Sequence, residues 1–232
     1  MQTASNHTLV AQWTEATYTV TYDANGGSVS PATQTKKYGS EYGTVPTPTK
    51  AGYAFAGWYL NGSKVTSDTV VSATTDHTLV ASWIKNVAVV ELSVENGGRD
   101  LTVDESNSAR DIITWSSLGL NFEELSAIGK TNVQIDVRFD AYVEDDGYQN
   151  VELAMGQELN TFFPFVPVYS IGSYEMESAV DEWITHRFTV NVDINTISSY
   201  PDCVLGIVWS ADDSWGSNEW KVGYTTYTFT VK

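Results

Sequence analysis

The 232-residue sequence has little cysteine, few cationic residues and no long apolar run. Its single cysteine, Cys203, excludes an internal disulfide, so the fold must be held together by an ordinary apolar core. Twelve Lys and Arg stand against 29 Asp and Glu, and 24 of these acids follow residue 84. Because such a surface repels phosphates, we expect no nucleic-acid partner. The lack of an apolar run of about 20 residues predicts no membrane insertion.

A seven-residue segment is repeated in this sequence. HTLVAQW at residues 7–13 returns as HTLVASW at residues 77–83, with six of seven residues identical, which indicates a module copied in tandem. The second copy can be followed back to YTVTYDANGG at Tyr18, whereas only the end of the first copy is present. We therefore predict three parts, which are the last strand of a truncated preceding repeat (1–14), one whole repeat (15–85) and a separate domain (86–232).

The complete copy has the signals of a small β module. Alternating residues predict strands near 18–22 and 53–58, and Asn25-Gly26-Gly27 and Asn61-Gly62 predict tight turns. In this order, YTVTYDANGG, YGTVPTPTKAGYAFAGWYLNG and VTSDTVVSATTDHTLVASW resemble the Listeria–Bacteroides repeat, the B-repeat of internalin-type surface proteins. The resemblance implies a β-grasp-like module, found in tandem in bacterial surface and secreted proteins as a stalk or spacer, without catalytic residues.

The C-terminal part alternates apolar and polar residues over most of its length. Gly-, Asp- and Ser-rich turns separate some eight segments of this kind, and a short helical turn is predicted in NFEELSAIG. An all-β chain that ends in an antiparallel β-sandwich of jelly-roll type is therefore expected. The aromatic segment from Phe162 to Trp183 is predicted to be a long loop over one end of the sandwich. The predicted strands are 87–94, 101–103, 111–115, 131–143, 151–155, 186–194, 204–210 and 224–232.

The layout of this part resembles the β-sandwich of carbohydrate-binding modules, in which a Trp before a late strand (EWITHRFTVNVDI) and a near-terminal I-x-W strand are common. A sugar presents a flat C–H face flanked by hydroxyls, so its site needs an exposed aromatic plane beside planar polar groups. Trp215, in a polar loop, is the predicted platform. The polar row of strand 131–143 is a second candidate, unless it is only a solvated sheet face. The predicted ligand-binding residues are Trp215, Trp220, Tyr148, Tyr174, Asp213, Asn218, Gln134 and Arg138.

Acidic turns offer the only candidate metal ligands. Carboxylate oxygens suit calcium, so a structural calcium ion is the one cofactor considered, with Asp145, Asp146 and Asp212 as candidate ligands. Acidic turns are also commonly just solvated. The sequence contains no G-x-S-x-G, no metal-spaced His pair and no phosphate loop, so we predict no enzyme activity in this chain, which can still be an accessory part of a larger enzyme.

The leading hypothesis is a non-catalytic polysaccharide-binding module attached to surface-protein repeats. We expect a monomer within a larger multimodular chain that is secreted or displayed at the cell surface. The acidic, aromatic-rich, nearly cysteine-free composition is typical of secreted proteins of Gram-positive bacteria. The alternative is an adhesin or stalk domain that binds a protein partner or acts as a spacer. An exposed group of Trp and Tyr would favour the first hypothesis, and a charged sandwich with every Trp buried would favour the second.

Overall fold

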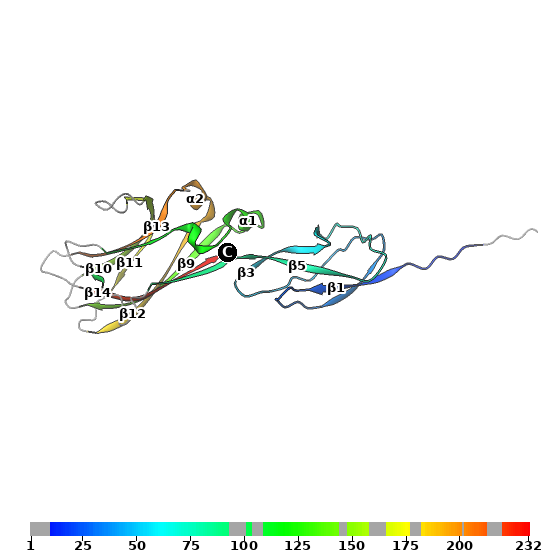
Figure 1. Ribbon diagram of the computed structural model, residues 1–232, viewed down its shortest axis with the longest axis horizontal. Coiled ribbons are helices and arrows are strands. Elements are labelled where there is room, and N and C mark those ends of the chain that lie inside the picture. The colour runs from blue at the N-terminus through cyan, green and yellow to red at the C-terminus, as the bar shows by residue number, and fades with distance from the viewer. Residues whose placement is uncertain are drawn as a thin grey trace, which may run out of the picture. The chain divides into compact units, whose positions relative to one another are not determined.

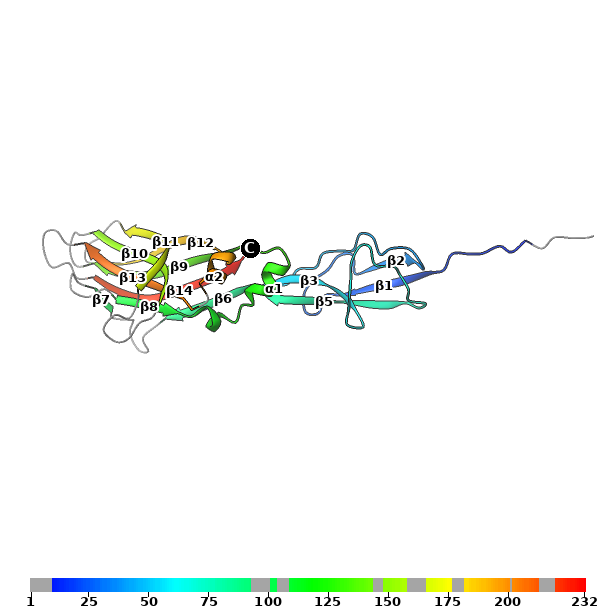
Figure 2. The same ribbon diagram turned by 90° about the horizontal axis from the view of Figure 1, so that it is seen from above.

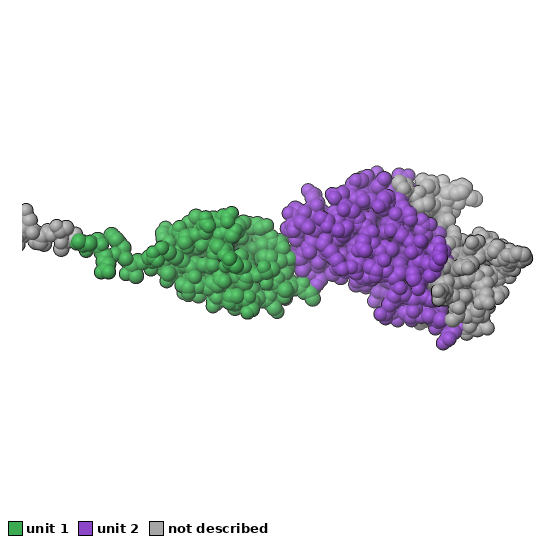
Figure 3. Space-filling view, turned by 180° about the vertical axis from the view of Figure 1, so that it is seen from behind, with its two compact units in different colours: residues 1–51, 55–83 green, residues 52–54, 84–232 purple. Residues whose placement is uncertain are grey.

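The computed structural model describes residues 10–92, 101–103, 109–143, 148–157, 166–176, 182–200, 202–212 and 220–232. Strands dominate these residues, and the chain is all-β, as predicted. It divides into two compact units, of which the first ends at Trp83 and the second begins at Ile84, with Gly52–Ala54 assigned to the second (Figure 3). None of the helices in the described ranges has the length and apolar character needed to cross a bilayer.

The first unit is built on one mixed sheet with the strand order β2-β1-β5-β3-β4 (Figure 1). The first and last strands, β1 and β5, are parallel neighbours, and the pairs β1–β2 and β3–β4 are antiparallel. Parallel central strands flanked by two hairpins give the β-grasp-like order expected of this segment. The strands are β1 (Thr17–Asp23), β2 (Thr33–Lys37), β3 (Tyr53–Leu60), β4 (Ser63–Val65) and β5 (His77–Lys85).

Aromatic residues form much of the small core of this unit. Trp58 is only 1% exposed, and its ring contacts those of Tyr22 and Phe55 at centroid distances of 5.0 and 5.4 Å. Its indole N–H donates to the Pro46 carbonyl oxygen at 2.8 Å, so the one polar atom of the side chain is satisfied. Trp58 is therefore a structural residue.

Residues 10–16, which include the end of the preceding copy, form no strand. The side chains of Val10 and Trp13 are 86% and 89% exposed. The equivalent strand of the complete copy, β5, lies between β1 and β3, and a strand is stable only when such neighbours accept and donate its backbone hydrogen bonds. The strand expected for this segment is thus not formed at residues 10–13, and residues 7–9 lie outside the described part of the chain.

The second unit is a sandwich of two antiparallel sheets (Figures 1 and 2). One sheet has the order β12-β9-β14-β6, with β7 also paired to β14, and the other has the order β11-β10-β13-β8. The strands are β6 (Val87–Leu92), β7 (Leu101–Val103), β8 (Ala109–Ile113), β9 (Asn132–Val143), β10 (Tyr148–Gln157), β11 (Val166–Met176), β12 (Trp183–Asp193), β13 (Val204–Asp212) and β14 (Trp220–Val231). The described residues of this unit also form the short helices η1 (Trp115–Leu118), α1 (Phe122–Ala127) and α2 (Ile194–Ser199).

The strand pairs of this unit are nested along the sequence. β10 pairs with β11, β9 with β12, β8 with β13 and β6 with β14, all antiparallel. Successive pairs alternate between the two sheets, which is the topology of a jelly roll. The predicted helical turn is α1, where the Asn121 side chain accepts a hydrogen bond from the backbone N–H of Glu124 at 3.1 Å.

Two predictions for the sandwich are wrong. The strand expected at 111–115 is β8, at Ala109–Ile113, and Trp115 begins the helix η1. Residues 166–176, predicted to belong to a loop, form the edge strand β11. Its register against β10 shifts at Leu153/Ala154 and again at Met155/Gly156, and these irregularities interrupt the alternation by which strands are recognised. Pro167 is tolerated because β11 is at the edge of its sheet.

The core lies between the two sheets. Strand β9 contributes a row of inward side chains, from Val133 to Ala141, that are at most 1% exposed. Tyr227 and Phe229 of β14 and Leu153 of β10 are fully buried beside them, and the single cysteine, Cys203, is also buried. Because side chains alternate along a strand, this inward row fixes an outward row of polar residues on the same sheet.

Candidate functional site

The outward face of the β12-β9-β14-β6 sheet carries the polar row predicted for strand 131–143. Strand β9 lies between β12 and β14, and the register aligns its outward residues with those of its neighbours. One line across the four strands joins Arg187, Arg138, Thr226 and Glu91. The next line joins Thr189, Asp136, Thr228 and Val89.

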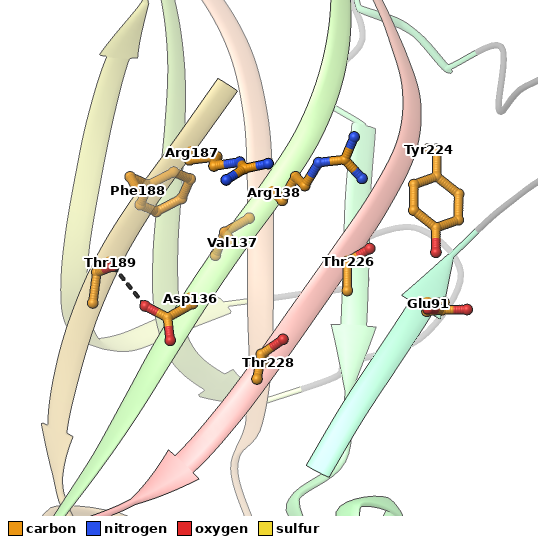
Figure 4. A pocket seen from close by; sticks show the side chains of 10 residues that line it. All are labelled: Glu91, Asp136, Val137, Arg138, Arg187, Phe188, Thr189, Tyr224, Thr226 and Thr228. Atoms are coloured by element: carbon orange, nitrogen blue, oxygen red, sulfur yellow. Dashed lines mark hydrogen bonds between the residues drawn. The ribbon is translucent and has the colours of Figure 1, made fainter. Parts of the chain in front are cut away.

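These two lines, apart from Val89, form the floor of a groove of about 530 Å³. Figure 4 shows the side chains that line it. Its volume is in the range of small-molecule sites, and its floor is a hydrogen-bonded sheet, so its polar groups are held in fixed relative positions. The lining residues come from β12, β9, β14 and β6, and they are Glu91, Asp136, Val137, Arg138, Arg187, Phe188, Thr189, Tyr224, Thr226 and Thr228.

Asp136 is the best-anchored polar residue of the groove. Its Oδ1 accepts hydrogen bonds from the Thr189 hydroxyl at 2.6 Å and from Gln134 Nε2 at 2.9 Å, and Nε2 also lies 2.7 Å from Oδ2. Gln134 in turn accepts a hydrogen bond from the Lys232 ammonium. Further along β9, Asp140 accepts a hydrogen bond from the Thr185 hydroxyl at 2.6 Å. Both carboxylates are thus engaged by neighbouring side chains.

Two arginines stand side by side in the groove. Arg138 of β9 and Arg187 of β12 are directly opposite one another in the antiparallel register, and both side chains are exposed. Within the described residues, neither guanidinium lies within 4 Å of a carboxylate. Like charges at directly opposite positions destabilise a sheet, so this placement is unfavourable for the isolated domain.

An exposed tryptophan continues the same face. Trp183, at the start of β12, is 51% exposed, and its ring lies 5.6 Å from that of Tyr142 on β9. It rests over Gly223, where the β14 register shifts between Val222 and Thr225. A Cβ atom at Gly223 would come within 2.9 Å of Trp183 Cζ3, so only glycine leaves room for the indole in this position.

Trp183 was not among the residues predicted to bind ligand, although the sequence contained the signal. Strict alternation places Trp183, Thr185, Arg187 and Thr189 on one face of β12, opposite the inward residues Phe188 and Val190. A tryptophan on the polar row of a strand is either covered by another segment or exposed. The register of the sheet and the contact between Trp183 and Gly223 decide between these two outcomes. The sequence of one strand alone reveals neither the register nor this contact.

The predicted site residues fall into three groups. Gln134 and Arg138 lie together on the outward face. Tyr174 is half-buried between the edges of the two sheets, stacked on Phe188 at 5.0 Å with its hydroxyl 3.5 Å from His186 Nδ1. A third group lies wholly or partly outside the described residues. Tyr148, Asp212 and Trp220 belong to β10, β13 and β14, but only their backbones are described. The residues outside the description altogether are Asp145, Asp146, Asp213, Trp215 and Asn218.

A half-buried histidine lies on the inner side of the same strands. His186 stacks on Phe139 with ring centroids 5.2 Å apart and an interplanar angle of 20°. Burial lowers the pKa of His186, and the carboxylate of Asp140 partly opposes this shift. The neutral form is therefore favoured in the folded protein, and His186 is a packing residue of the inner face.

The described residues contain no group of three His, Cys, Asp or Glu side chains able to hold a metal ion. The candidate calcium ligands Asp145 and Asp146, and the side chain of Asp212, fall outside the part of the chain to which this statement applies. The structural calcium ion therefore stays a prediction.

Comparison with known families assigns the first unit. Residues 18–82 match the family model of the Listeria–Bacteroides repeat domain. The match begins in β1 and ends in β5, so it coincides with the β-grasp-like sheet.

Two relatives come from Evansella cellulosilytica. One carries the name "Putative Gly-rich membrane protein" and is 33% identical over 106 residues, covering 42% of this chain and 11% of that protein. The other, "Putative membrane protein", is 33% identical over 107 residues, covering 44% of this chain and 15% of that protein. The aligned segment is thus a small part of the length of either relative.

Among solved structures, two of infectious bursal disease virus align with this chain. That of the Gx strain has a TM-score of 0.34 at 8% identity, covering 66% of this chain and 34% of that one. That of the VP2 subviral particle has a TM-score of 0.31 at 9% identity, covering 74% and 37%.

The histidine that recurs with the Listeria–Bacteroides repeat is fully engaged in hydrogen bonds. His77 Nε2 lies 2.6 Å from the hydroxyl of the buried Tyr42, and Nδ1 lies 3.0 Å from the Thr75 carbonyl oxygen. Trp83 of the repeat is half-buried, and its indole N–H donates to the Ala24 carbonyl oxygen at 2.9 Å. These residues hold the repeat together, and the candidate site belongs to the second unit.

Proposed function

We propose that the second unit is a non-catalytic polysaccharide-binding module that binds its ligand on the outward face of the β12-β9-β14-β6 sheet. Trp183 is the stacking platform, and the groove beside it supplies the polar groups that hold the sugar hydroxyls. The observation that carries the proposal is the half-exposed indole of Trp183, which packs over Gly223 on the same sheet face as the polar groove.

An exposed indole on a sheet is suited to sugars. The ring presents a flat π surface on which the C–H face of a pyranose can stack. Trp183 belongs to a strand and leans on Tyr142 and Gly223, so its orientation is fixed before the ligand arrives. A preorganised platform loses little side-chain entropy on binding.

The groove complements this platform with hydrogen-bonding groups. The hydroxyls of Thr226 and Thr228 lie on β14, and the anchored carboxylate of Asp136 lies on β9 opposite Thr228. From Trp183 to Arg187 is four residues along β12, which is roughly 13 Å at the usual rise per residue of a strand. A ligand that reaches both is therefore longer than a single sugar ring, which favours a polysaccharide over a monosaccharide.

The surroundings of the module support an extracellular role. The Listeria–Bacteroides repeat is the kind of segment that serves as a spacer in bacterial surface proteins, and two relatives carry names that describe membrane proteins. In this proposal the parent protein is secreted or displayed at the cell surface. The second unit acts as a monomeric binding module beside the repeat.

Affinity gel electrophoresis of the whole chain tests the proposal. The chain should be retarded by at least one polysaccharide of a panel of neutral and acidic polymers, and Trp183→Ala should abolish the retardation without lowering the melting temperature. Tyr169→Ala is the matched control, because Tyr169 is also exposed, at 42%, but lies on β11 in the other sheet. Retardation by no polymer would favour the alternative of a spacer or protein-binding adhesin domain, and loss through Tyr169→Ala alone would move the site to the other sheet.

A further inference from the structure

We infer that the ligand of this face is an anionic polysaccharide, whose carboxylate or sulfate group is bound between Arg138 and Arg187. The inference rests on the proposed function and specifies the class of its ligand. It is carried by the placement of two arginines at opposite register positions in the groove, on the sheet face that also carries Trp183.

The pairing of these two residues has a cost that an anion removes. The chain contains only four arginines, and two of them stand opposite each other on neighbouring strands, where Cβ atoms are about 4.5–5.5 Å apart. An anion between two guanidinium groups cancels their repulsion and accepts charge-assisted hydrogen bonds from both. A neutral sugar hydroxyl can use one guanidinium as a donor, but it leaves the repulsion between the two in place.

The carboxylates of the groove do not serve as this anion. Asp136 is turned toward Thr189, whose hydroxyl donates a hydrogen bond to it (Figure 4). It also accepts a hydrogen bond from Gln134 Nε2. Glu91 lies two strands away from Arg138, across β14, which is roughly 10 Å at the usual strand spacing. The two guanidinium groups are therefore available to a ligand that enters the groove.

Hydroxyl groups complete the anion site. Thr226 is the register partner of Arg138 on the side opposite Arg187, so a hydroxyl adjoins the arginine pair on the groove floor. Carboxylate and sulfate oxygens accept several hydrogen bonds each, and a threonine hydroxyl can supply one that the guanidinium groups do not. The two arginines and Thr226 thus form a local cationic site in a strongly acidic protein.

The net charge of −17 makes binding to such a polymer informative. A protein of this charge has no general attraction for polyanions, and its long-range repulsion is screened beyond about 8–10 Å at ordinary ionic strength. Retention of an anionic polymer must therefore come from a local contact. Carboxylates of uronic acids and sulfate esters share the chemistry that the arginine pair recognises, and only experiment separates these two sources.

Binding of the whole chain to matched polymers tests this inference. Polygalacturonate carries carboxylates, its methyl ester is the neutral counterpart, and dextran sulfate and dextran form the second pair. We expect retention of an anionic member over its neutral counterpart. Arg138→Gln and Arg187→Gln should each weaken it by about tenfold or more, the effect of losing hydrogen bonds to a charged group. Retention by polygalacturonate assigns a carboxylate, and retention by dextran sulfate alone assigns a sulfate ester.

Two further variants make the outcome specific. Arg187→Lys keeps the charge but loses the planar fork, so it should retain only part of the affinity if the contact is bidentate. Lys130→Gln removes one positive charge outside the groove lining and should change nothing.

Failure of the inference is distinguishable from failure of the proposed function. If neutral polymers are retained as strongly as anionic ones, and only Trp183→Ala weakens binding, the anion site is refuted while the polysaccharide-binding face stands. An effect of Lys130→Gln as large as that of the arginine variants would also overturn the anion site. If no polymer of either kind is retained, the proposed function itself is refuted.

Discussion

The contact between the Trp183 indole and Gly223 allows a quantitative test of what holds the indole in position. In Gly223→Ala the new Cβ would lie 2.9 Å from Trp183 Cζ3 and 3.4 Å from the Asp140 carbonyl oxygen. Carbon atoms in contact prefer separations of about 3.5–4.0 Å, so the indole must move by about 0.6–1.1 Å. Overpacking a core by one carbon costs about 1–3 kcal/mol, and because this ring is half-exposed and can lift, we expect about 1 kcal/mol.

The same Gly223→Ala substitution made in the Trp183→Ala variant separates this clash from other effects of alanine. In Trp183→Ala the ring is gone, and Gly223→Ala should then be neutral or stabilising, because alanine lowers the entropy of the unfolded chain, an effect of about 0.4–1 kcal/mol. Equilibrium unfolding by denaturant of the four proteins of the cycle measures the difference. Equal destabilisation by Gly223→Ala in both backgrounds would refute the idea that Gly223 is the seat of Trp183.

Other predictions follow from the two cores. Trp58→Ala should lower the stability of the repeat by about 3–5 kcal/mol, because it leaves a cavity and an unpaired Pro46 carbonyl, and calorimetry should show the transition of the second unit unchanged. Burial lowers the pKa of His186 below its ordinary value of 6.5, so the unfolded chain binds the proton first. The contribution of this lowered pKa to the free energy of unfolding is fully present above about pH 6.5. It is lost as the pH falls through the pKa of His186 in the folded protein. The unfolding free energy of His186→Asn should therefore fall less than that of the wild type between about pH 7.5 and pH 5, and parallel curves would contradict this assignment.

Strict alternation predicted much of the fold. The residues of β9, from Asn132 to Val143, alternate without interruption, and both the inward row and the polar outward row were predicted from them. By contrast, β11 escaped prediction because bulges and Pro167 break its period. The six residues of α2 are too few for a helical period to be visible, although Asp193 accepts a hydrogen bond from the N–H of Asn195 at its start.

The candidate site was predictable only in part. Gln134 and Arg138 were chosen because they belong to the outward row of one strand, and this information is local. The opposition of Arg138 and Arg187 depends on the register between strands that are distant in sequence. The seat of Trp183 depends in addition on a register shift in β14, at Gly223. Such positions are fixed by pairing across the whole sheet, which no periodicity within a single strand reveals.

Nuclear magnetic resonance of the labelled chain tests the central claim most directly. On titration with an oligosaccharide of the retained polymer, the indole N–H of Trp183 and the backbone amides of β9 and β12 around Arg138 and Arg187 should shift. The indole N–H groups of Trp58 and Trp83 in the repeat should stay unchanged. Shifts confined to the β11-β10-β13-β8 sheet or to the repeat would contradict the account.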